Sequence, residues 1–228
     1  MSNPFLHLWT VLVYFVHLLL SLSFHESAHA WTAWRLGDPT ARYQGRITLN
    51  PLPHIDPIGT VLLPLISLLA GGIVVGWAKP TPVNPQYFRH PRRGQMLTAL
   101  AGPVSNLLLA TCFALVYHAL QLVFTGAYRT GAYRTGLVAE LVLTICLVGV
   151  QLNITLALFN LLPLFPLDGS WVAEGILPRR WLVYWYQAKP FMPFMLMALF
   201  LIPGFFGTLL TPVLRLLMNL LGVGDAWA

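Results

Sequence analysis

Charged side chains are scarce in this sequence, and their scarcity decides its class. Only 9% of the 228 residues are Asp, Glu, Lys or Arg, 57% are hydrophobic, and the mean hydropathy is +0.70. A soluble domain of this length needs far more charge to cover its surface. No polar segment is long enough to form a separate soluble domain. We therefore expect an integral membrane protein that forms a single polytopic domain over residues 1–228.

Cysteine is nearly absent, and the basic residues are dispersed. Cys112 and Cys146 lie inside apolar runs and form no Cys-x-x-Cys pair, so we interpret both as small core residues rather than a disulfide or a ligand pair. The net charge is +6, but its residues stand in short segments between apolar runs, where membrane topology places them. Without a separate basic domain, nucleic acid is not an expected partner.

Long apolar runs are what the chain does contain. Residues 5–24 carry no Asp, Glu, Lys or Arg, and similar stretches lie at 59–78, 96–124, 137–167 and 191–221. Each is near or above the ~20 residues that a helix needs to cross ~30 Å of hydrocarbon. We predict an all-α bundle of about five to six membrane segments. The interruption at Pro203-Gly204 leaves the last run as either one kinked helix or two short ones.

The N-terminal run and the linkers allow three further expectations. No Lys or Arg precedes Arg35, so we expect residues 5–24 to be a retained membrane helix, extending to about residue 36, rather than a signal peptide. Residues 37–57 are rich in turn-forming residues and contain one β-like stretch at 44–49. Residues 79–93 contain four prolines, which exclude a regular helix there.

An H-E-x-x-H motif, His25-Glu26-Ser27-Ala28-His29, follows the first apolar run. Positions i and i+4 of a helix lie on the same face, so both imidazoles can reach one metal ion. Glu26, beside the first ligand, is placed to act as general base on water. An ionisable residue at membrane depth costs at least ~2.5–3.5 kcal/mol on insertion scales, so this placement indicates a functional site.

A catalytic zinc usually has three protein ligands, and few carboxylates are available for the third position. The acidic residues are Glu26, Asp38, Asp56, Glu140, Asp168, Glu174 and Asp225. Asp168 has the most suitable setting, because Pro163 and Pro166 stop the preceding helix and Gly169 frees the backbone beyond. We expect Asp168 to project from extended chain at membrane depth; a capping aspartate at a helix terminus is the alternative. The nearby Asn160 amide can hydrogen-bond a substrate carbonyl or its developing oxyanion.

These motifs resemble the site-2 protease family of intramembrane zinc metalloproteases. The resemblance rests on residues 25–29 and on Asn160-x-x-Pro163-x-x-x-Leu167-Asp168-Gly169, with further likeness at 45–51, 76–80 and 101–106, and it covers about residues 20 to 170. The short, single-domain branch fits best, since no segment resembles a PDZ or CBS domain. The resemblance implies one Zn²⁺ per chain on His25, His29 and Asp168. It also implies Glu26 as base, with Asn160 and Asn106 near the substrate.

The same resemblance implies an endopeptidase that cuts peptide bonds in or near transmembrane segments of other membrane proteins. The expected partners are such a substrate and membrane lipid, and the oligomeric state is left open. The expected location is the plasma (inner) membrane of a prokaryote. The alternatives are a non-catalytic metal-binding scaffold or transporter, and a prenyl-protein endopeptidase. Transport usually requires polar residues spread along a pathway, and prenyl-protein endopeptidases use glutamate rather than aspartate as the third ligand.

The site also constrains the topology. If every apolar run up to residue 167 crossed the membrane, the runs holding His25 and Asp168 would be antiparallel, and the ligands would approach opposite faces. If residues 59–78 enter and return, the two runs are parallel and the ligands share a depth. The re-entrant arrangement puts ten basic residues on one face and two on the other, so the positive-inside rule favours it, with the site nearer the cytoplasm. The ten are Arg35, Arg42, Arg46, Lys79, Arg89, Arg92, Arg93, Arg179, Arg180 and Lys189.

Overall fold

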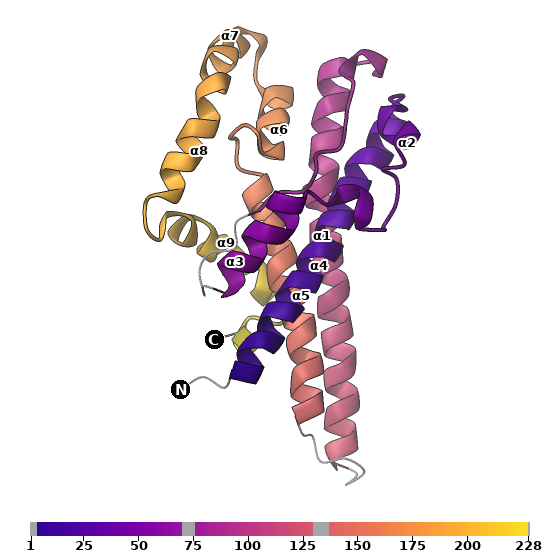
Figure 1. Cartoon of the computed structure of the whole chain (residues 1–228), viewed down its shortest axis with the longest axis vertical. Helices are drawn as coiled ribbons and strands as arrows, with labels where there is room; N and C mark the ends of the chain where they lie inside the picture. The colour runs from indigo at the N-terminus through magenta and orange to yellow at the C-terminus, as the bar shows by residue number, and fades with distance from the viewer. Residues whose placement is uncertain (1–3, 70–75, 130–136, 228) are drawn as a thin grey trace.

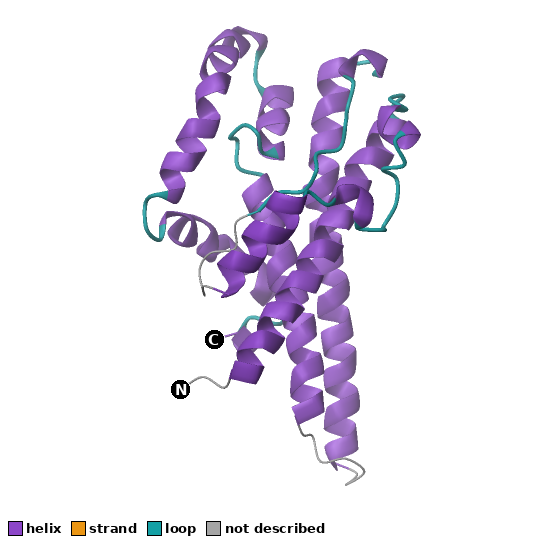
Figure 2. Cartoon of the chain, viewed as in Figure 1, coloured by secondary structure: helices purple, strands orange, loops and turns teal. Residues whose placement is uncertain are grey.

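The computed structural model describes residues 4–69, 76–129 and 137–227, and every regular element in these ranges is helical (Figures 1 and 2). Three helices are long and apolar enough to cross a membrane: α1 (Pro4–Arg35), α4 (Pro91–Arg129) and α5 (Leu137–Asn160). They fall on the first, third and fourth apolar runs. The prediction of an all-α integral membrane protein is confirmed.

Contacts between these helices fix their directions. α1 and α4 are antiparallel, because the ring of His17 packs 5.2 Å from that of Phe113 while His29, three turns later, reaches the carbonyl of Thr98. α5 runs parallel to α1, because the Tyr14 hydroxyl donates to Gln151 in the second half of α5, and the histidines later in α1 face Asp168, just beyond the end of α5. The site therefore lies near the C-terminal ends of both helices (Figure 1).

Residues 57–79 enter the molecule and return to the same level. The first part comprises a π-helical turn, η2 (Pro57–Leu62), and α3 (Leu63–Leu69); residues 70–75 lie outside the described residues. The backbone N–H of Trp77 donates to the carbonyl of Gly59 at 3.0 Å, and the Thr60 hydroxyl donates to the carbonyl of Trp77 at 2.8 Å. Gly59 and Thr60, near the start of the segment, are thus hydrogen-bonded to Trp77, near its end. The segment is therefore re-entrant, which is the arrangement that allows His25 and Asp168 to share a depth.

The chain beyond α5 forms a short helix and a bent helical arm. α6 (Asp168–Ile176) is followed by α7 (Arg179–Ala188), η4 (Lys189–Phe191) and α8 (Met192–Phe200), and the arm then turns by 89° into α9 (Phe205–Leu220). The last apolar run is thus two helices, because Gly204 between them has a φ of +74°, in the left-handed region that glycine enters without steric cost. Among the described residues there are thus three candidate membrane spans, or four if the bent arm counts as one span, beside the re-entrant segment.

The predicted β-like element is absent from the described residues. Residues 44–49 lie between α2 (Thr40–Tyr43) and η1 (Leu52–His54) and form a turn followed by irregular chain. Gly45 has a φ of +67°, and the buried Arg46 donates to the carbonyls of Pro53 and Pro80. The prediction is wrong because Arg46 binds the backbone of later segments instead of alternating across a strand.

The prolines of residues 79–93 give the expected irregular chain only up to residue 90. Residues 76–84 are without regular structure and lead into η3 (Pro85–Tyr87). α4 then begins at Pro91, before the apolar run at 96–124, because a proline in the first turn of a helix lacks only an N–H that would be unpaired anyway. At the other end of the chain, η5 (Asp225–Trp227) follows α9.

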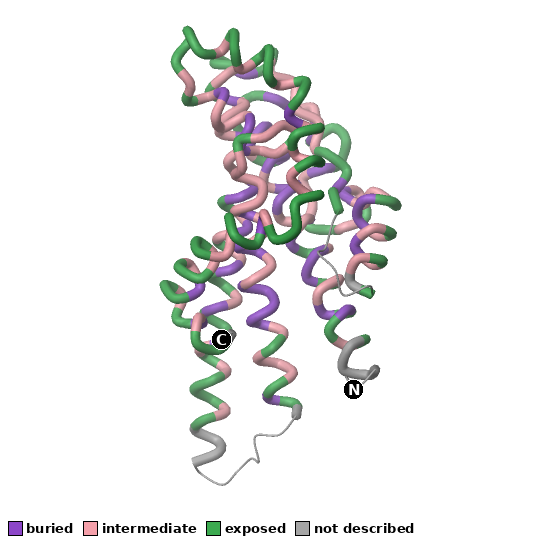
Figure 3. The backbone as a smooth tube through the Cα atoms, turned by 90° about the vertical axis from the view of Figure 1, so that its left-hand side faces the viewer, coloured by how far each residue is buried: buried purple, intermediate pink, exposed green. Residues whose placement is uncertain are grey.

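The apolar core lies between α4, α5 and α9, where Ala114, Val150, Ile154 and Met218 are buried (Figure 3). Cys146 belongs to this core, as predicted, but Cys112 is exposed. The prediction for Cys112 is wrong because a membrane helix can expose an apolar side chain to lipid without cost, so an apolar run does not identify which side faces the core.

One face of α4 is apolar and uncovered. Leu108, Leu115 and Leu122 recur every seventh residue, and 63–76% of each side chain is exposed. In water such a stripe would attract a partner or aggregate; along a membrane span it is the surface that hydrocarbon covers. The stripe accordingly agrees with the membrane placement of α4.

Candidate metal centre

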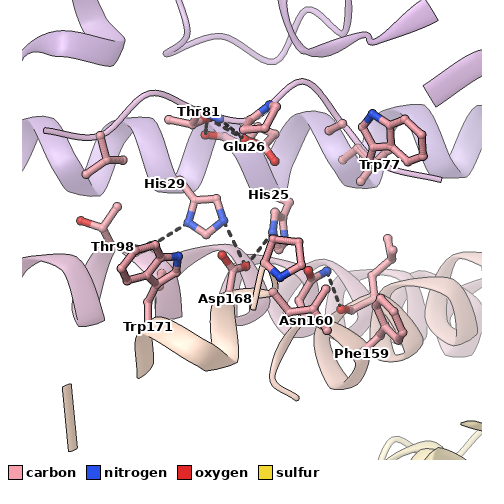
Figure 4. A pocket seen from close by; sticks show the side chains of 18 of the residues that line it. His25, Glu26, His29, Trp77, Thr81, Thr98, Phe159, Asn160, Asp168 and Trp171 are labelled. Carbon is pink, nitrogen blue, oxygen red and sulfur yellow. Dashed lines mark hydrogen bonds and ion pairs between the residues drawn. The ribbon is translucent and has the colours of Figure 1, made fainter. Parts of the chain in front are cut away.

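The histidines of the H-E-x-x-H motif lie on one face of α1, as the helix period requires. The rings of His25 and His29 are 4.6 Å apart between centroids, at right angles to each other, and both residues are buried. Their Nε2 atoms point to a common position between α1 and α6 (Figure 4).

α6 brings Asp168 to that position. One carboxylate oxygen, Oδ2, lies 3.0 Å from Nε2 of His25 and 3.2 Å from Nε2 of His29. Asp168 is the first residue of a helix rather than part of extended chain, so that expectation is corrected: Leu167 is the extended residue, and the helix starts directly after it. The Asp168 side chain does not cap the helix, because it turns toward α1 instead.

The turn between α5 and α6 depends on a glycine. A Cβ added at Gly169 would lie 2.2 Å from the carbonyl oxygen of Leu161. Only a residue without a side chain lets the start of α6 pack this closely on the end of α5. This close approach holds Asp168 within 3.0–3.2 Å of the histidine nitrogens.

Hydrogen bonds at the far side of each ring define which nitrogen carries the proton. Nδ1 of His25 lies 2.6 Å from Oδ1 of Asn106, and Nδ1 of His29 lies 2.7 Å from the carbonyl oxygen of Thr98. A carbonyl oxygen accepts only, so each Nδ1 donates and each neutral ring presents a lone pair at Nε2. Two ring lone pairs therefore face the same carboxylate oxygen.

This arrangement fits a metal ion. Oδ2 of Asp168 is buried and has no hydrogen-bond donor, and three acceptors converge within 4.8 Å of one another. A cation between them removes the repulsion and satisfies the buried oxygen. The ligand separations of 3.0–3.2 Å are slightly shorter than the ~3.3–3.6 Å edges of a tetrahedron whose metal–ligand bonds are ~2.0–2.2 Å, the distances typical of zinc with nitrogen and oxygen, so a small outward movement of the side chains accommodates the ion.

α4 approaches the histidines at a glycine. A Cβ added at Gly102 would lie 2.5 Å from Nε2 of His29 and 2.6 Å from Cε1 of His25. Any larger residue would push into both rings. Gly102 lies in the 101–106 segment noted in the sequence, but its role there becomes visible only when α1 and α4 are packed together.

Glu26 is held beside the metal position by the chain that leaves the re-entrant segment. Its Oε2 accepts from the backbone N–H of Thr81 at 2.9 Å and from the Thr81 hydroxyl at 2.7 Å. The residue is largely buried and lines the same cavity as the histidines. Sequence reasoning missed Thr81; its place directly after the 76–80 segment was the available signal.

The cavity over the site has a volume of about 540 Å³ and is walled by apolar and aromatic side chains, including Trp77, Phe159 and Trp171. Asn160 lines this cavity, as its predicted substrate contact requires, and its amide nitrogen donates to the carbonyl of Leu156. Asn106 is elsewhere: it is fully buried behind His25 and does not line the cavity. The expectation of a substrate contact at Asn106 therefore does not match its position.

Comparisons with known proteins agree on one family. A family model described as "Peptidase family M50" matches residues 13–202. "Putative zinc metalloprotease YwhC" of Bacillus subtilis is 41% identical over 191 residues, covering 82% of this chain and 80% of that protein. "Putative zinc metalloprotease Rip2" of Mycobacterium tuberculosis is 32% identical over 185 residues, covering 81% of this chain and 65% of that protein. No solved structure matches the chain.

Proposed function

Because the chain belongs to peptidase family M50, the site-2 protease family that its motifs resemble, we propose that it is an intramembrane zinc endopeptidase. Its substrates would be other membrane proteins, cut in or near their transmembrane segments. The observation that carries the proposal is the convergence of His25, His29 and Asp168 beside a tethered Glu26, inside a cavity with largely apolar walls.

Each residue at the site has a role that its contacts support. His25, His29 and Asp168 would hold zinc, which when bound polarises the scissile carbonyl and acidifies a water molecule. Glu26 would take the proton of that water and deliver it to the leaving amide nitrogen. Its Oε2 is occupied by the two donors of Thr81, so the carboxylate is held in one orientation while it does so. The Asn160 amide would steady the developing oxyanion.

The cavity supports a peptide substrate in extended form. About 540 Å³ is within the range of small-molecule and peptide pockets but is too small for an intact helix with its side chains. The substrate helix would therefore unwind locally before its peptide bond reaches Glu26. Apolar walls suit the side chains of a transmembrane segment.

We further propose that the site faces the cytoplasmic side of a plasma membrane. The C-terminal end of α1, α2, the start of α4 and α7 lie at the same end of the molecule (Figure 1), and these elements carry six of the ten basic residues counted above: Arg35, Arg42, Arg92, Arg93, Arg179 and Arg180. The end of α4 and the start of α5 lie at the opposite end, and the sequence there has two basic residues, Arg129 at the end of α4 and Arg134, which is outside the described residues. The positive-inside rule assigns the richer end to the cytoplasm.

The test uses purified protein with pooled synthetic transmembrane peptides in liposomes, analysed by mass spectrometry. Wild type should contain one zinc per chain and cut some of the peptides. Glu26→Gln should keep its zinc and lose at least ~10²-fold in rate, since proton transfer by a positioned base contributes that much. Glu140→Gln, an exposed residue at the start of α5, is the matched control and should remain active.

Two further variants test the ligand set. His25→Ala and Asp168→Ala come from segments far apart in sequence, and each should lose zinc. Full activity in Glu26→Gln, or zinc that persists without Asp168, would contradict the assigned site. Zinc binding with no cleavage of any peptide would instead favour a metal-binding scaffold or transporter.

A further inference from the structure

Asn106 occupies a position that the catalytic scheme does not use. It lies on α4 one turn after Gly102, and no part of it is exposed. Its Oδ1 is 2.6 Å from Nδ1 of His25, on the side of the ring opposite Asp168. Its Nδ2 is 3.3 Å from the carbonyl oxygen of Ser21 and 2.9 Å from Oδ1 of Asn153 on α5. One buried amide therefore connects α1, α4 and α5.

The orientation of this amide is set by groups that can only accept. Nδ2 of Asn153 donates to the carbonyl of Gly149 at 2.8 Å, so Oδ1 of Asn153 faces Asn106. That oxygen and the carbonyl oxygen of Ser21 both need a donor, and the only donor in the Asn106 side chain is Nδ2. The remaining atom, Oδ1, must then face His25. A flipped amide at Asn106 would place acceptors against acceptors at two contacts.

The two histidines differ in how their Nδ1 protons are held. For His29 the acceptor is the backbone carbonyl of Thr98, whose direction the helix fixes. For His25 the acceptor is a side chain, which keeps its direction only while its own partners hold it. Metal-binding histidines depend on such outer contacts to select the tautomer and to orient the ring.

We propose that Asn106 and Asn153 are positioning residues of the metal centre, which act through His25. A chain of hydrogen bonds runs from the carbonyl of Gly149 through the side-chain amides of Asn153 and Asn106 to Nδ1 of His25. It leaves the lone pair of His25 Nε2 directed at Oδ2 of Asp168. This inference rests on the proposed zinc site and adds a set of residues that never contact substrate.

A purely structural role is the competing explanation, because buried amides also join membrane helices through hydrogen bonds. The same chain supplies a matched example. The Tyr14 hydroxyl donates to Oε1 of Gln151 at 2.9 Å, which joins α1 to α5 without touching the site. If the asparagines serve only helix packing, replacing them should affect the metal no more than replacing Gln151.

The experiment measures zinc affinity by chelator competition on the full chain in detergent, together with the visible absorption of bound Co²⁺. Asn106→Leu keeps the shape but removes the acceptor, and we expect zinc affinity to fall about 10–100-fold with an altered Co²⁺ spectrum. Asn106→Asp keeps an oxygen beside Nδ1 and should bind clearly more tightly than Asn106→Leu. Asn153→Leu should weaken zinc less than Asn106→Leu, since the carbonyl of Ser21 still holds the amide.

Gln151→Leu is the control and should bind zinc as wild type does. Wild-type affinity in Asn106→Leu, or an equal loss in Asn106→Asp and Asn106→Leu, would overturn the proposal. If Asn106→Leu fails to fold, the comparison of Asn153→Leu with Gln151→Leu decides instead: equal affinities would overturn it. A wild type that binds zinc but cleaves nothing would refute the protease function and leave this inference standing.

Discussion

The role of Asp168 as a metal ligand is inferred from the groups that surround its side chain. Its Oδ2 is buried without a hydrogen-bond donor and faces the lone pairs of His25 and His29. In a structural ion pair the partner would be a permanent cation such as arginine. Two rings whose Nδ1 protons are already committed make a divalent ion the simplest source of the missing positive charge.

Thr81 offers a prediction at the same scale. Thr81→Val removes the hydroxyl donor to Glu26 and keeps the backbone donor, so the carboxylate should be held less firmly. We expect kcat to fall roughly 10-fold, since a hydrogen bond to a charged group is worth about 1.5–3 kcal/mol and one of two remains. Zinc content should stay at one per chain, as measured by metal analysis.

Thr111→Val is the control for that substitution. Thr111 lies on an exposed part of α4, and its hydroxyl bonds only the carbonyl of Leu107 within the same helix. Activity should be unchanged there. Loss of zinc in Thr81→Val would mean that the residue supports the metal ligands rather than the base.

At the scale of elements, the site depends on how closely α4 approaches α1. Gly102→Ala adds one methyl carbon that would lie about 2.5 Å from both histidine rings. The rings or the helix must move, so we expect zinc affinity to fall by at least about 10-fold, with cleavage lost in parallel. The measurement is chelator competition on the purified variant.

Gly207→Ala provides the comparison for Gly102→Ala. Gly207 also lies inside a helix, α9, and a Cβ there meets nothing within 4 Å. It should bind zinc normally and gain slightly in stability from the lower entropy of its unfolded chain. Equal zinc affinities in the two alanine variants would show that the close packing at Gly102 does not matter to the centre.

At the scale of the whole molecule, the parallel directions of α1 and α5 allow the ligands to meet. Those directions require that residues 57–79 return to the face from which they entered, as the bond from Trp77 to Gly59 indicates. The linkers before and after this segment should therefore be accessible from the same side of the membrane.

Cysteine labelling tests this topology. In a background with Cys112 and Cys146 replaced by serine, Tyr43→Cys and Arg89→Cys should react with an impermeant reagent from one face only, the same for both. Both positions are exposed in the structure. Labelling from opposite faces would mean that residues 57–79 cross the membrane, and the site geometry would then need another explanation.

The C-terminal half adds a second whole-molecule feature. The guanidinium of Arg92, at the start of α4, donates to the carbonyls of Glu174 and Leu177 at the end of α6. The Glu174 side chain in turn accepts from Lys189, which also lies 3.3 Å over the ring of Trp171 in the cavity wall. The helix that carries Asp168 is thus anchored to both the bundle and the bent arm.

The sequence predicted the features that local patterns decide. Helix location followed from the length of the apolar runs, and the shared face of His25 and His29 followed from their spacing of four. Asp168 was selected because few carboxylates exist and because the neighbouring prolines and glycine shape its backbone. The sequence left open whether residues 59–78 cross the membrane or return, but it favoured the return, since two ligands at one site must share a depth.

Only the tertiary structure decided the contacts between segments far apart in sequence. The β-like stretch at 44–49 is irregular chain, because Arg46 binds the carbonyl of Pro80 in a later segment. Cys112 is exposed instead of lying in the core. Asn106 came to lie behind His25 instead of in the cavity, and Thr81 met Glu26 from 55 residues away. A membrane helix is apolar on every side, so its sequence does not tell which face meets a neighbour. The packing of the helices determines which face meets a neighbour, and it therefore also determines the hydrogen bonds behind the metal ligands.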